Sequence, residues 1–378
     1  KHEAIKQALV ALLGSENVSD NKGILEAYTR DWLPPGVLDH FPPEFVALPE
    51  TTEEVQAIYK LANRYSFHCI PVGSNLWSVA TKPTRPFSII LDPKRMNRIV
   101  DIDEKNMYAI IEPYVSNAQV SAEAMKRGLV CGNPEAGGQA SQLAGHTFQG
   151  FWGIGYRIGM GYRNILGFEW VLPSGELLRT GALSQPNAGW AFGEGPGPDL
   201  RGMLRGYLGD MGGLGMVTRM AIKLHPWPGP TAFPCEGMVP NQKSELPPDT
   251  FEWILFKYPH LKDCVKAMYE IGRSEIGGNL QKWPTSYLCW WRSRSAEEYW
   301  DTWKSGYYQK NMKNMVAVCL WGFTSKKQLG YEKRVLMDII KETKATLIDQ
   351  ECYDKWVPYT ANNWIRDTNG PRMMLPSG

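Results

Sequence analysis

Three glycine-rich segments are the part of this sequence best suited to chemistry. The first surrounds Gly73, the second runs from Gly137 to Gly145, and the third runs from Gly212 to Gly215. Backbone N–H groups that glycine and other small residues leave accessible bind a pyrophosphate without a positively charged side chain. Three such segments in one chain therefore predict that the backbone holds a large, extended cofactor that carries phosphate.

Each segment has a distinct sequence context. Pro71-Val-Gly-Ser-Asn-Leu-Trp-Ser78 follows a short predicted strand at His68–Val72, and Gly212-Gly-Leu-Gly-Met-Val-Thr218 continues into an apolar strand. The second segment, Asn133–His146, is too long and too rich in glycine for a simple turn. A plain strand-to-strand turn is an equally good interpretation of the first segment alone, so the prediction depends on all three.

The common nucleotide-binding and metal-binding motifs are absent from the sequence. No G-x-G-x-x-G lies between a strand and a helix, and no Walker A motif occurs. In Gly153-Ile-Gly155 the next glycine, Gly159, comes one residue too late. The cysteines are scattered singly, which argues against a disulfide framework and a CxxC metal site and predicts mostly buried, hydrophobic side chains. They are Cys69, Cys131, Cys235, Cys264, Cys289, Cys319 and Cys352.

The composition argues against two classes of partner. Lys+Arg of 41 against Asp+Glu of 39 leaves a net charge of +2, which predicts no binding to nucleic acid. No apolar run is long enough to span a bilayer. Ile5, Leu9 and Leu12 have helical spacing, so the first residues predict an amphipathic helix and not a signal peptide. We therefore expect a cytoplasmic protein; because the sequence does not begin with Met, a processed leader and a periplasmic location stay open.

The elements that must position the glycine segments form an α+β arrangement. A hairpin is predicted from strands at 165–172 and 176–180 around the turn Pro173-Ser-Gly175. A capping box at Thr51-Thr-Glu-Glu54 begins a helix. The other elements predicted before residue 228 are a helix at Ala118–Arg127 and strands at Ser88–Leu91, Ile99–Asp101 and Met107–Glu112.

A proline-rich break at Pro226–Pro230 separates a second α+β domain, so we predict domains at 1–228 and 229–378. The tryptophans that are dense between Trp283 and Trp321 favour an aromatic-lined cavity or an apolar interface. The elements predicted in the second domain are strands at Phe251–Tyr258, Met315–Phe323 and Thr346–Ile348 and helices at Leu261–Ile271 and Lys326–Thr343.

Several motifs occur together in one order. They are the Gly-Ser-Asn of the first segment, R-x-G-x-x-x-x-N-x-L-G-x-E from Arg157 to Glu169, and G-L-G-x-V-T of the third segment. Over residues 45–228 this combination resembles the FAD-binding domain of the vanillyl-alcohol oxidase family, also named after p-cresol methylhydroxylase (PCMH). The segments 134–138, 153–156 and 167–181 are most similar to the branch that oxidises 4-substituted phenols. The branch of D-2-hydroxy-acid dehydrogenases shares the general pattern less closely.

The resemblance implies a PCMH-type FAD-binding domain of two small α+β subdomains, followed by a partial α+β cap that binds substrate. It places the FAD pyrophosphate on the first segment, and the second and third along the ribityl chain and flavin ring. The residues implied at the phosphates are Val72, Gly73, Ser74, Asn75, Leu76 and Trp77. Those implied near the sugar and ring are Ser141, Gly145 and His146, with backbone contacts from Gly155 and Val217.

The resemblance also suggests catalytic residues. Glu135 matches an acidic residue near the reactive edge of the flavin, as a base or charge stabiliser; a solvated loop carboxylate is the alternative. Tyr156 and Arg157, together with Arg163, are candidates to hold an anionic substrate, or the arginines pair with surface carboxylates. The second-domain aromatics that line an aromatic pocket, or alternatively fill the core, are Trp283, Trp290, Trp291 and Trp321.

The sequence departs from the family pattern in four places. The first segment has no His, so flavin attachment through that segment is ruled out, and it has Trp77-Ser78 where phenol oxidases place a substrate tyrosine. His146 stands where Asn is common. The metal-binding H-x-G-D-G-N segment of the hydroxy-acid branch is missing, so we expect no metal. Only about thirty residues follow Ile348, where relatives continue the cap; a fragment, parts supplied from elsewhere and a shortened branch all stay open.

We therefore expect an FAD-dependent oxidoreductase that removes a hydride from a small aromatic alcohol or 4-alkylphenol to flavin N5. A D-2-hydroxy-acid dehydrogenase of the lactate or glycolate type is one alternative. A non-catalytic FAD-binding subunit of an electron-transfer complex is another. The electron acceptor, whether oxygen, a cytochrome or an electron-transfer flavoprotein, and assembly as a homo-oligomer or complex stay open.

Overall fold

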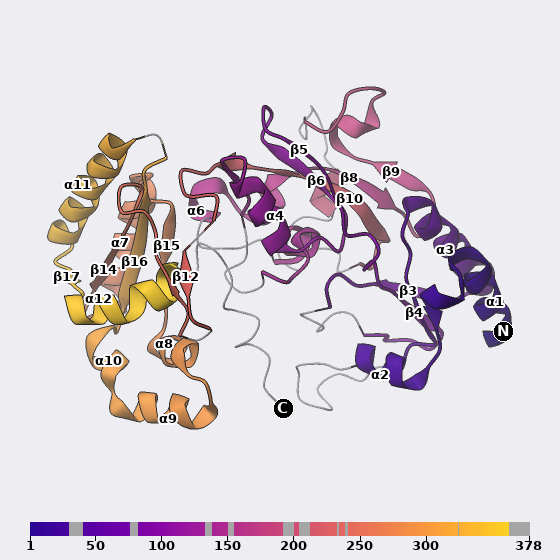
Figure 1. Ribbon diagram of the computed structural model, residues 1–378, viewed down its shortest axis with the longest axis horizontal. Helices are drawn as coiled ribbons and strands as arrows, with labels where there is room; N and C mark the ends of the chain where they lie inside the picture. The colour runs from indigo at the N-terminus through magenta and orange to yellow at the C-terminus, as the bar shows by residue number, and fades with distance from the viewer. Residues whose placement is uncertain are drawn as a thin grey trace.

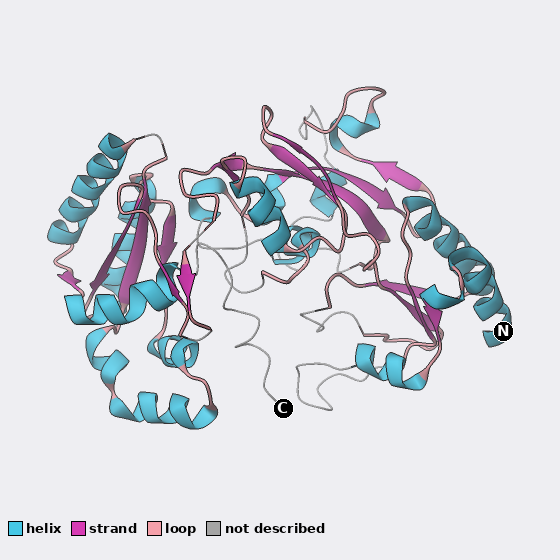
Figure 2. Ribbon diagram, in the orientation of Figure 1, coloured by secondary structure: helices cyan, strands magenta, loops and turns pink. Residues whose placement is uncertain are grey.

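The computed structural model describes residues 1–29, 41–75, 82–132, 138–149, 155–191, 200–203, 212–232, 234–238, 241–323 and 325–362. Figure 1 shows the N-terminal elements at one end of the molecule and the elements after residue 250 at the other. Helices and sheets are mixed throughout the described part (Figure 2), which confirms the α+β class.

The first sheet has the strand order β1-β2-β4-β3. Its strands are β1 (Val18–Ser19), β2 (Phe45–Ala47), β3 (His68–Pro71) and β4 (Ser88–Leu91). β2, β4 and β3 are parallel, so their carboxyl ends lie at one edge, from which the first glycine segment leaves β3. Helices α1 (His2–Leu13) and α3 (Thr52–Tyr65) pack on one face of the sheet, and Leu25 and Tyr28 of α2 (Lys22–Thr29) pack on the other.

Helix α3 begins where the sequence predicted. The Thr51 hydroxyl accepts a hydrogen bond from the Glu54 N–H (3.1 Å), and Val55, Ile58, Tyr59 and Ala62 are buried on one face. The Glu54 carboxylate accepts a hydrogen bond from the Glu50 N–H (2.7 Å). In a standard capping box it would accept from the N–H of the N-cap residue, Thr51. In α1 the buried face is Ile5, Leu9 and Leu13, so Leu13 takes the place that we expected for Leu12.

The second sheet is antiparallel and has the order β5-β6-β10-β8-β9. Its strands are β5 (Ile99–Asp103), β6 (Tyr108–Ile111), β8 (Ile165–Val171), β9 (Leu177–Arg179) and β10 (Met216–Lys223). Helix α4 (Asn117–Met125) begins at a capping box formed by Ser116 and Gln119 and buries Val120 and Ala124 against the sheet. The strands β7 (Leu129–Val130) and β11 (His225–Pro226) form a separate, antiparallel two-stranded sheet.

The predicted hairpin is confirmed by the pairing of β8 with β9. Its turn carries Gly175 at φ 83°, a left-handed conformation that glycine adopts without steric cost. The turn also docks on α3: the side chains of Gln56 and Asn63 donate to the Gly175 and Pro173 carbonyl oxygens (2.9 and 2.7 Å). The hairpin therefore joins the first sheet's helix layer to the second sheet.

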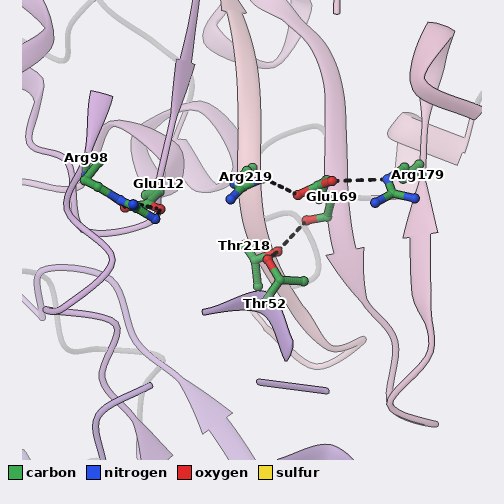
Figure 3. A network of polar contacts seen from close by, with 7 residues as sticks. All are labelled: Thr52, Arg98, Glu112, Glu169, Arg179, Thr218 and Arg219. Carbon is green, nitrogen blue, oxygen red and sulfur yellow. Dashed lines mark hydrogen bonds and ion pairs between the residues drawn. The ribbon is translucent and has the colours of Figure 1, made fainter. Parts of the chain in front are cut away.

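Buried polar contacts reinforce this junction (Figure 3). The Thr52 hydroxyl of α3 donates to the Thr218 hydroxyl of β10 (3.0 Å), which in turn donates to the Glu169 carbonyl oxygen of β8 (3.4 Å). The buried Glu169 carboxylate lies between Arg179 of β9 (3.1 Å) and Arg219 of β10 (3.4 Å). A side chain from each neighbouring strand thus compensates the buried charge.

The C-terminal sheet has the order β15-β16-β14-β17, with antiparallel pairs. Its strands are β14 (Phe251–Lys257), β15 (Asn279–Gln281), β16 (Met315–Trp321) and β17 (Thr346–Leu347). Helices α7 (Leu261–Arg273) and α11 (Lys326–Glu342) pack on one face. The other face contacts α8 (Thr285–Arg292), α10 (Tyr307–Asn311) and α12 (Gln350–Trp356), with α9 (Ala296–Ser305) beside them. We call this sheet with its helices the cap; the alternation of strand and helix predicted for it is confirmed.

An aromatic core fills the inner face of the cap. Trp321 lies with its ring centroid 5.4 Å from that of Phe251 and 5.5 Å from that of Trp227. Trp321 is 1% exposed, which supports the core interpretation of the two that were open for that residue. Trp283 stacks on Tyr287 with centroids 4.3 Å apart. Because Trp227 belongs to this core, the connection between the two parts of the chain is itself packed.

The cysteines have the environment that the sequence predicted. Five of the seven cysteines are buried and all are free, as predicted for hydrophobic side chains. Within the described residues no group of His, Cys, Asp and Glu side chains is arranged to hold a metal ion. In the same residues, no helix combines the length and the apolar character needed to cross a membrane.

Candidate functional site

The first glycine segment begins at the carboxyl end of β3. The Val72 N–H donates to the Leu91 carbonyl oxygen of β4 (3.0 Å), which fixes where the chain leaves the sheet. Asn75 has φ 54°, the left-handed conformation that lets successive N–H groups line an anion-binding concavity. Of the residues expected at the phosphates, Val72, Gly73, Ser74 and Asn75 are therefore placed at a sheet edge suited to a ligand. Leu76 and Trp77 lie outside the described residues.

The second segment contacts the first. The Ser141 N–H donates to the Ser74 Oγ (3.1 Å), and the Ser141 hydroxyl donates to the Pro113 carbonyl oxygen (2.6 Å). A Cβ atom on Gly73 would lie 3.1 Å from the Ser141 Cβ and 3.4 Å from the Ala144 Cβ, so glycine permits this approach. From Ser141 onward the segment is not a loop: Ser141 caps the helical turn α5 (Gln142–Ala144), which continues into the π-helical turn η3 (Gly145–Gln149).

The third segment also meets the first. Gly212 has φ 78°, and a Cβ atom there would lie 2.7 Å from the Pro71 Cγ at the end of β3. Gly215 has φ 115°, and its Cβ would lie 2.1 Å from the Val171 carbonyl oxygen of the hairpin. The strand that follows carries Val217, opposite Trp170 of β8. The described parts of the three glycine segments thus converge on the end of β3, although they are far apart in the sequence.

His146 is completely buried in η3. Its Nδ1 lies 3.0 Å from the Gln142 carbonyl oxygen and 2.9 Å from the Gln142 Nε2, and that amide also donates to the Gly132 carbonyl oxygen (3.0 Å). Burial lowers the pKa of His146 to about 4, so the ring is neutral at physiological pH. His146 therefore brings no positive charge to a bound flavin. Gly145, the first residue of η3, donates its N–H to the Ser141 carbonyl oxygen (2.8 Å).

Gln142 is a site residue that sequence reasoning missed. Its spacing of four residues from His146 places both on one helical face, which is the signal that predicts their contact. His225, on β11, is a second buried histidine, and its Nε2 lies 2.9 Å from the Asn164 Oδ1. Burial lowers its pKa to about 4 as well.

Two of the expected catalytic residues, Tyr156 and Arg157, lie at a contact with the cap. Tyr156 and Arg157 belong to α6 (Gly155–Ile158), which contacts β15 of the cap (Figure 1). The Arg157 guanidinium donates to the Glu275 carbonyl oxygen of the cap. Gly155, the buried first residue of α6, lies at the start of this contact. Glu135 lies outside the described residues, as does the side chain of Trp291.

The three segments fit a dinucleotide such as FAD. Because Gly73 and Gly212 have no Cβ, the segments pack closely at the end of β3, and the first segment offers backbone N–H groups next to small hydroxyl side chains. A separate open hollow of about 350 Å³ lies over η5 (Gly181–Ser184) and is lined by Arg179, Leu183, Ser184, Gln185, Pro186, Asn187 and Gly189. That hollow contains none of the expected site residues.

Comparison with known proteins agrees with this assignment. Residues 43–181 match the family model of an FAD binding domain. The chain is 29% identical over 228 residues to glycolate oxidase subunit GlcD of Bacillus subtilis, covering 59% of this chain and 45% of that protein. It is 31% identical over 231 residues to the 4-cresol dehydrogenase (hydroxylating) flavoprotein subunit of Pseudomonas putida, covering 59% and 42%. The chain thus spans less than half the length of these curated relatives.

The fold is shared over a longer stretch. The crystal structure of p-cresol methylhydroxylase with substrate bound superposes with a TM-score of 0.75 at 19% identity, covering 98% of this chain and 71% of that one. Fold and converging segments together define an FAD-binding flavoprotein domain. The chain carries an FAD binding domain over residues 43–181, resembles the 4-cresol dehydrogenase flavoprotein subunit in sequence, and shares the fold of p-cresol methylhydroxylase.

Proposed function

We propose that the chain is the FAD-binding and cap portion of an oxidoreductase that oxidises a small aromatic alcohol or a 4-alkylphenol. The observation that carries the proposal is the convergence of Gly73, Ser141 and Gly212 at the end of β3; helix α6 contacts the cap. When bound, FAD supplies the acceptor for a hydride from the substrate carbon. Residues 1–228 would hold FAD and residues 229–378 would cover the substrate.

The chain's own residues would bind and orient the cofactor and accept a proton. The first segment's N–H groups would bind the pyrophosphate, and the Ser74 and Ser141 contact would keep the first two segments in register. His146 would present a neutral ring to the ribityl and flavin side, because its pKa is about 4. Glu135 is the residue that we propose as proton acceptor or charge stabiliser, on the basis of its place in the sequence.

Partly buried aromatic side chains packed against the core of the cap, among them Trp283, Tyr287 and Trp290, favour an aromatic substrate. Trp283 and Tyr287 stack at 4.3 Å, and the polar side chains of Asn279 and Gln281 are buried on the same face of the sheet as Cys319. Aromatic surfaces with a few polar groups are typical of pockets that orient a ring. The phenol-oxidising relative and the substrate-bound structure support the same substrate class.

A D-2-hydroxy acid is the second candidate substrate. The similarity to glycolate oxidase subunit GlcD extends over 228 residues and favours it. A third candidate is an FAD-binding subunit without a substrate of its own. The electron acceptor of the first two would be oxygen, a cytochrome or an electron-transfer flavoprotein.

The visible spectrum of the purified protein, recorded without oxygen before and after addition of 4-ethylphenol or 4-hydroxybenzyl alcohol, tests the proposal. We expect an oxidised flavin spectrum that bleaches with either compound, and an E135Q variant that bleaches at least tenfold more slowly. Bleaching only with D-lactate or D-2-hydroxyglutarate would transfer the assignment to the hydroxy acids. A flavin that no compound reduces would favour the non-catalytic subunit, and a colourless protein that takes up no added FAD would refute the FAD site.

A further inference from the structure

A short helix of the FAD-binding part is inserted into the cap. Helix α6 (Gly155–Ile158) has four residues, and it contacts β15 across more than a hundred positions of sequence. Ile158 packs against the aromatic core of the cap. The two central residues of α6, Tyr156 and Arg157, contact the cap turn that contains Glu275 and Gly277.

Tyr156 is half-buried, and its buried hydroxyl group faces a glycine of the cap. Its hydroxyl oxygen lies 2.9 Å from the point where a Cβ on Gly277 would stand, so any side chain at 277 would collide with it. Among the described residues no group hydrogen-bonds to this buried hydroxyl. Burial raises the pKa of Tyr156 well above its ordinary value, and the Glu332 carboxylate acts in the same direction, so the hydroxyl stays protonated.

The cap turn that receives Tyr156 is rigidly held. Gly277 has φ 80°, and its N–H donates to the buried Glu332 carboxylate of α11 (2.7 Å). Glu332 also accepts from Gln328 one helical turn earlier (2.9 Å). Glu275, at φ 52°, starts the turn. The left-handed conformations of Glu275 and Gly277 and the buried Glu332 carboxylate thus fix the shape of the turn against which Tyr156 packs.

Arg157 completes the contact from the same helix. Its guanidinium donates to the Glu275 carbonyl oxygen and lies 5.5 Å from the centroid of the Phe323 ring, at the end of β16. The Glu275 carbonyl oxygen and the Phe323 ring both belong to the cap. The positive charge of Arg157 therefore contacts the cap of the same chain.

We propose that Tyr156 and Arg157 are positioning residues that fix the cap over the flavin, and that neither binds the substrate. Because Gly155, the first residue of α6, is expected to give the flavin a backbone contact, a bound FAD and a docked cap would stabilise each other. This inference rests on the FAD site of the proposed function but is independent of the substrate class. It assigns to these two residues a role different from the catalytic one that the sequence suggested.

A double-mutant cycle tests the Tyr156 contact. G277A adds a Cβ that collides with the Tyr156 oxygen, and Y156F removes that oxygen. The strain of placing Ala at φ 80° is the same in both backgrounds and cancels in the cycle. We expect G277A to lower the unfolding temperature by about 2 to 4 °C more in the wild-type background than in Y156F. Equal shifts in the two backgrounds would show that the contact does not exist.

Release of FAD tests the positioning role. R157A should release FAD roughly tenfold faster than wild type, because a hydrogen bond from a charged donor is lost. It should also alter the visible circular dichroism of the flavin at saturating FAD. The matched control is R273A, which removes an exposed arginine of the cap whose partner among the described residues is Glu270 of its own helix. Wild-type release and an unchanged flavin signal in both R157A and Y156A would overturn the proposal.

The two proposals fail in different ways. If the protein takes up no FAD, the proposed function is refuted, while the double-mutant cycle on the flavin-free protein still measures the Tyr156 contact. If FAD binds and a phenol does not reduce it, only the substrate class is wrong. A loss of reduction rate in Y156F with unchanged FAD release and unchanged flavin dichroism would instead make Tyr156 a substrate-binding residue.

Discussion

Burial decides what single residues of this site can contribute. His146 is fully buried and held by Gln142, so the ring is neutral at physiological pH. Gly73 and Gly212, at the end of β3, contribute backbone groups and allow a close approach of the segments, because they have no side chains. The site as described is therefore built from neutral donors, which suits a cofactor whose charge lies on a pyrophosphate.

His146 predicts how stability depends on pH. Its pKa of about 4 in the folded protein lies below the ordinary value of 6.5, so the unfolded chain binds more protons between these values. Stability should be full above about pH 6.5 and fall as the pH drops towards 4, by up to about 3 kcal/mol from this residue. His225 adds a contribution of the same sign. Urea unfolding of wild type and H146N from pH 7 to 5 measures it; the same slope in both proteins would contradict the assignment.

Gly73 predicts how tightly the first two segments can pack around the cofactor. A Cβ at Gly73 would press on Ser141 at 3.1 Å, while the backbone itself tolerates alanine. G73A should shift Ser141 and weaken FAD binding roughly tenfold, with little loss of stability in the flavin-free protein. Fluorescence titration with FAD measures the affinity. G202A is the matched control, because a Cβ at Gly202 meets nothing within 4 Å; equal affinities of the two variants would contradict the close approach.

At the scale of elements, the hairpin turn connects α3 to the second sheet. A Cβ at Gly175 would lie 2.7 Å from the Lys60 Cγ and 2.9 Å from the Gln56 carbonyl oxygen, and Gly175 has φ 83°. G175A should therefore cost about 2 to 4 kcal/mol, from backbone strain plus overpacking. G189A shares the strain, at φ 69°, but meets nothing within 4 Å, and should cost about 1 kcal/mol. Chemical denaturation of both variants measures the difference, and equal losses would show that the docking on α3 contributes nothing.

Elements with a strong local signal could be predicted from the sequence. Helix α3 with its Thr51 cap, the 165–180 hairpin, and β14, α7, β16 and α11 of the cap were all predicted close to their observed bounds. Two-residue strands such as β1 and β7 were missed, because so short a segment has no measurable periodicity. The turns α5 and η3 were predicted as part of a loop, because the glycines around Ser141 made its role as a helix cap hard to recognise.

The site itself was only half predictable. The glycine segments could be recognised one by one, and their residue types indicated phosphate binding. Their convergence depends on contacts such as Ser74 with Ser141, which no local pattern encodes. Tyr156 was a catalytic candidate from the resemblance, and its contact with Gly277, far along the chain, could not be predicted from the sequence. Roles that depend on a distant partner are the ones that a single sequence does not specify.

At the scale of the whole molecule, the contacts of α6 predict that the two parts of the chain unfold together. FAD binds only the folded protein and should raise its unfolding temperature. Because Trp227 and α6 join the cap to the FAD-binding part, calorimetry with FAD should show one transition. An R157A/Y156A variant should separate it into two, with FAD shifting only one of them. A wild-type protein whose cap melts on its own, unaffected by FAD, would contradict this coupling.

The strand order of the second sheet has a consequence for how the protein is made. β10 lies in the middle of the sheet, between β6 and β8, and pairs Met220 with Ile111 and Phe168. During synthesis the ribosome releases two separate hairpins, β5–β6 and β8–β9, whose facing edges stay unpaired until β10 emerges. Nascent chains that stop short of Lys223 would expose both edges to chaperones and to each other. The last strand to be translated therefore closes the sheet and, in the same event, delivers the third glycine segment to the cofactor site.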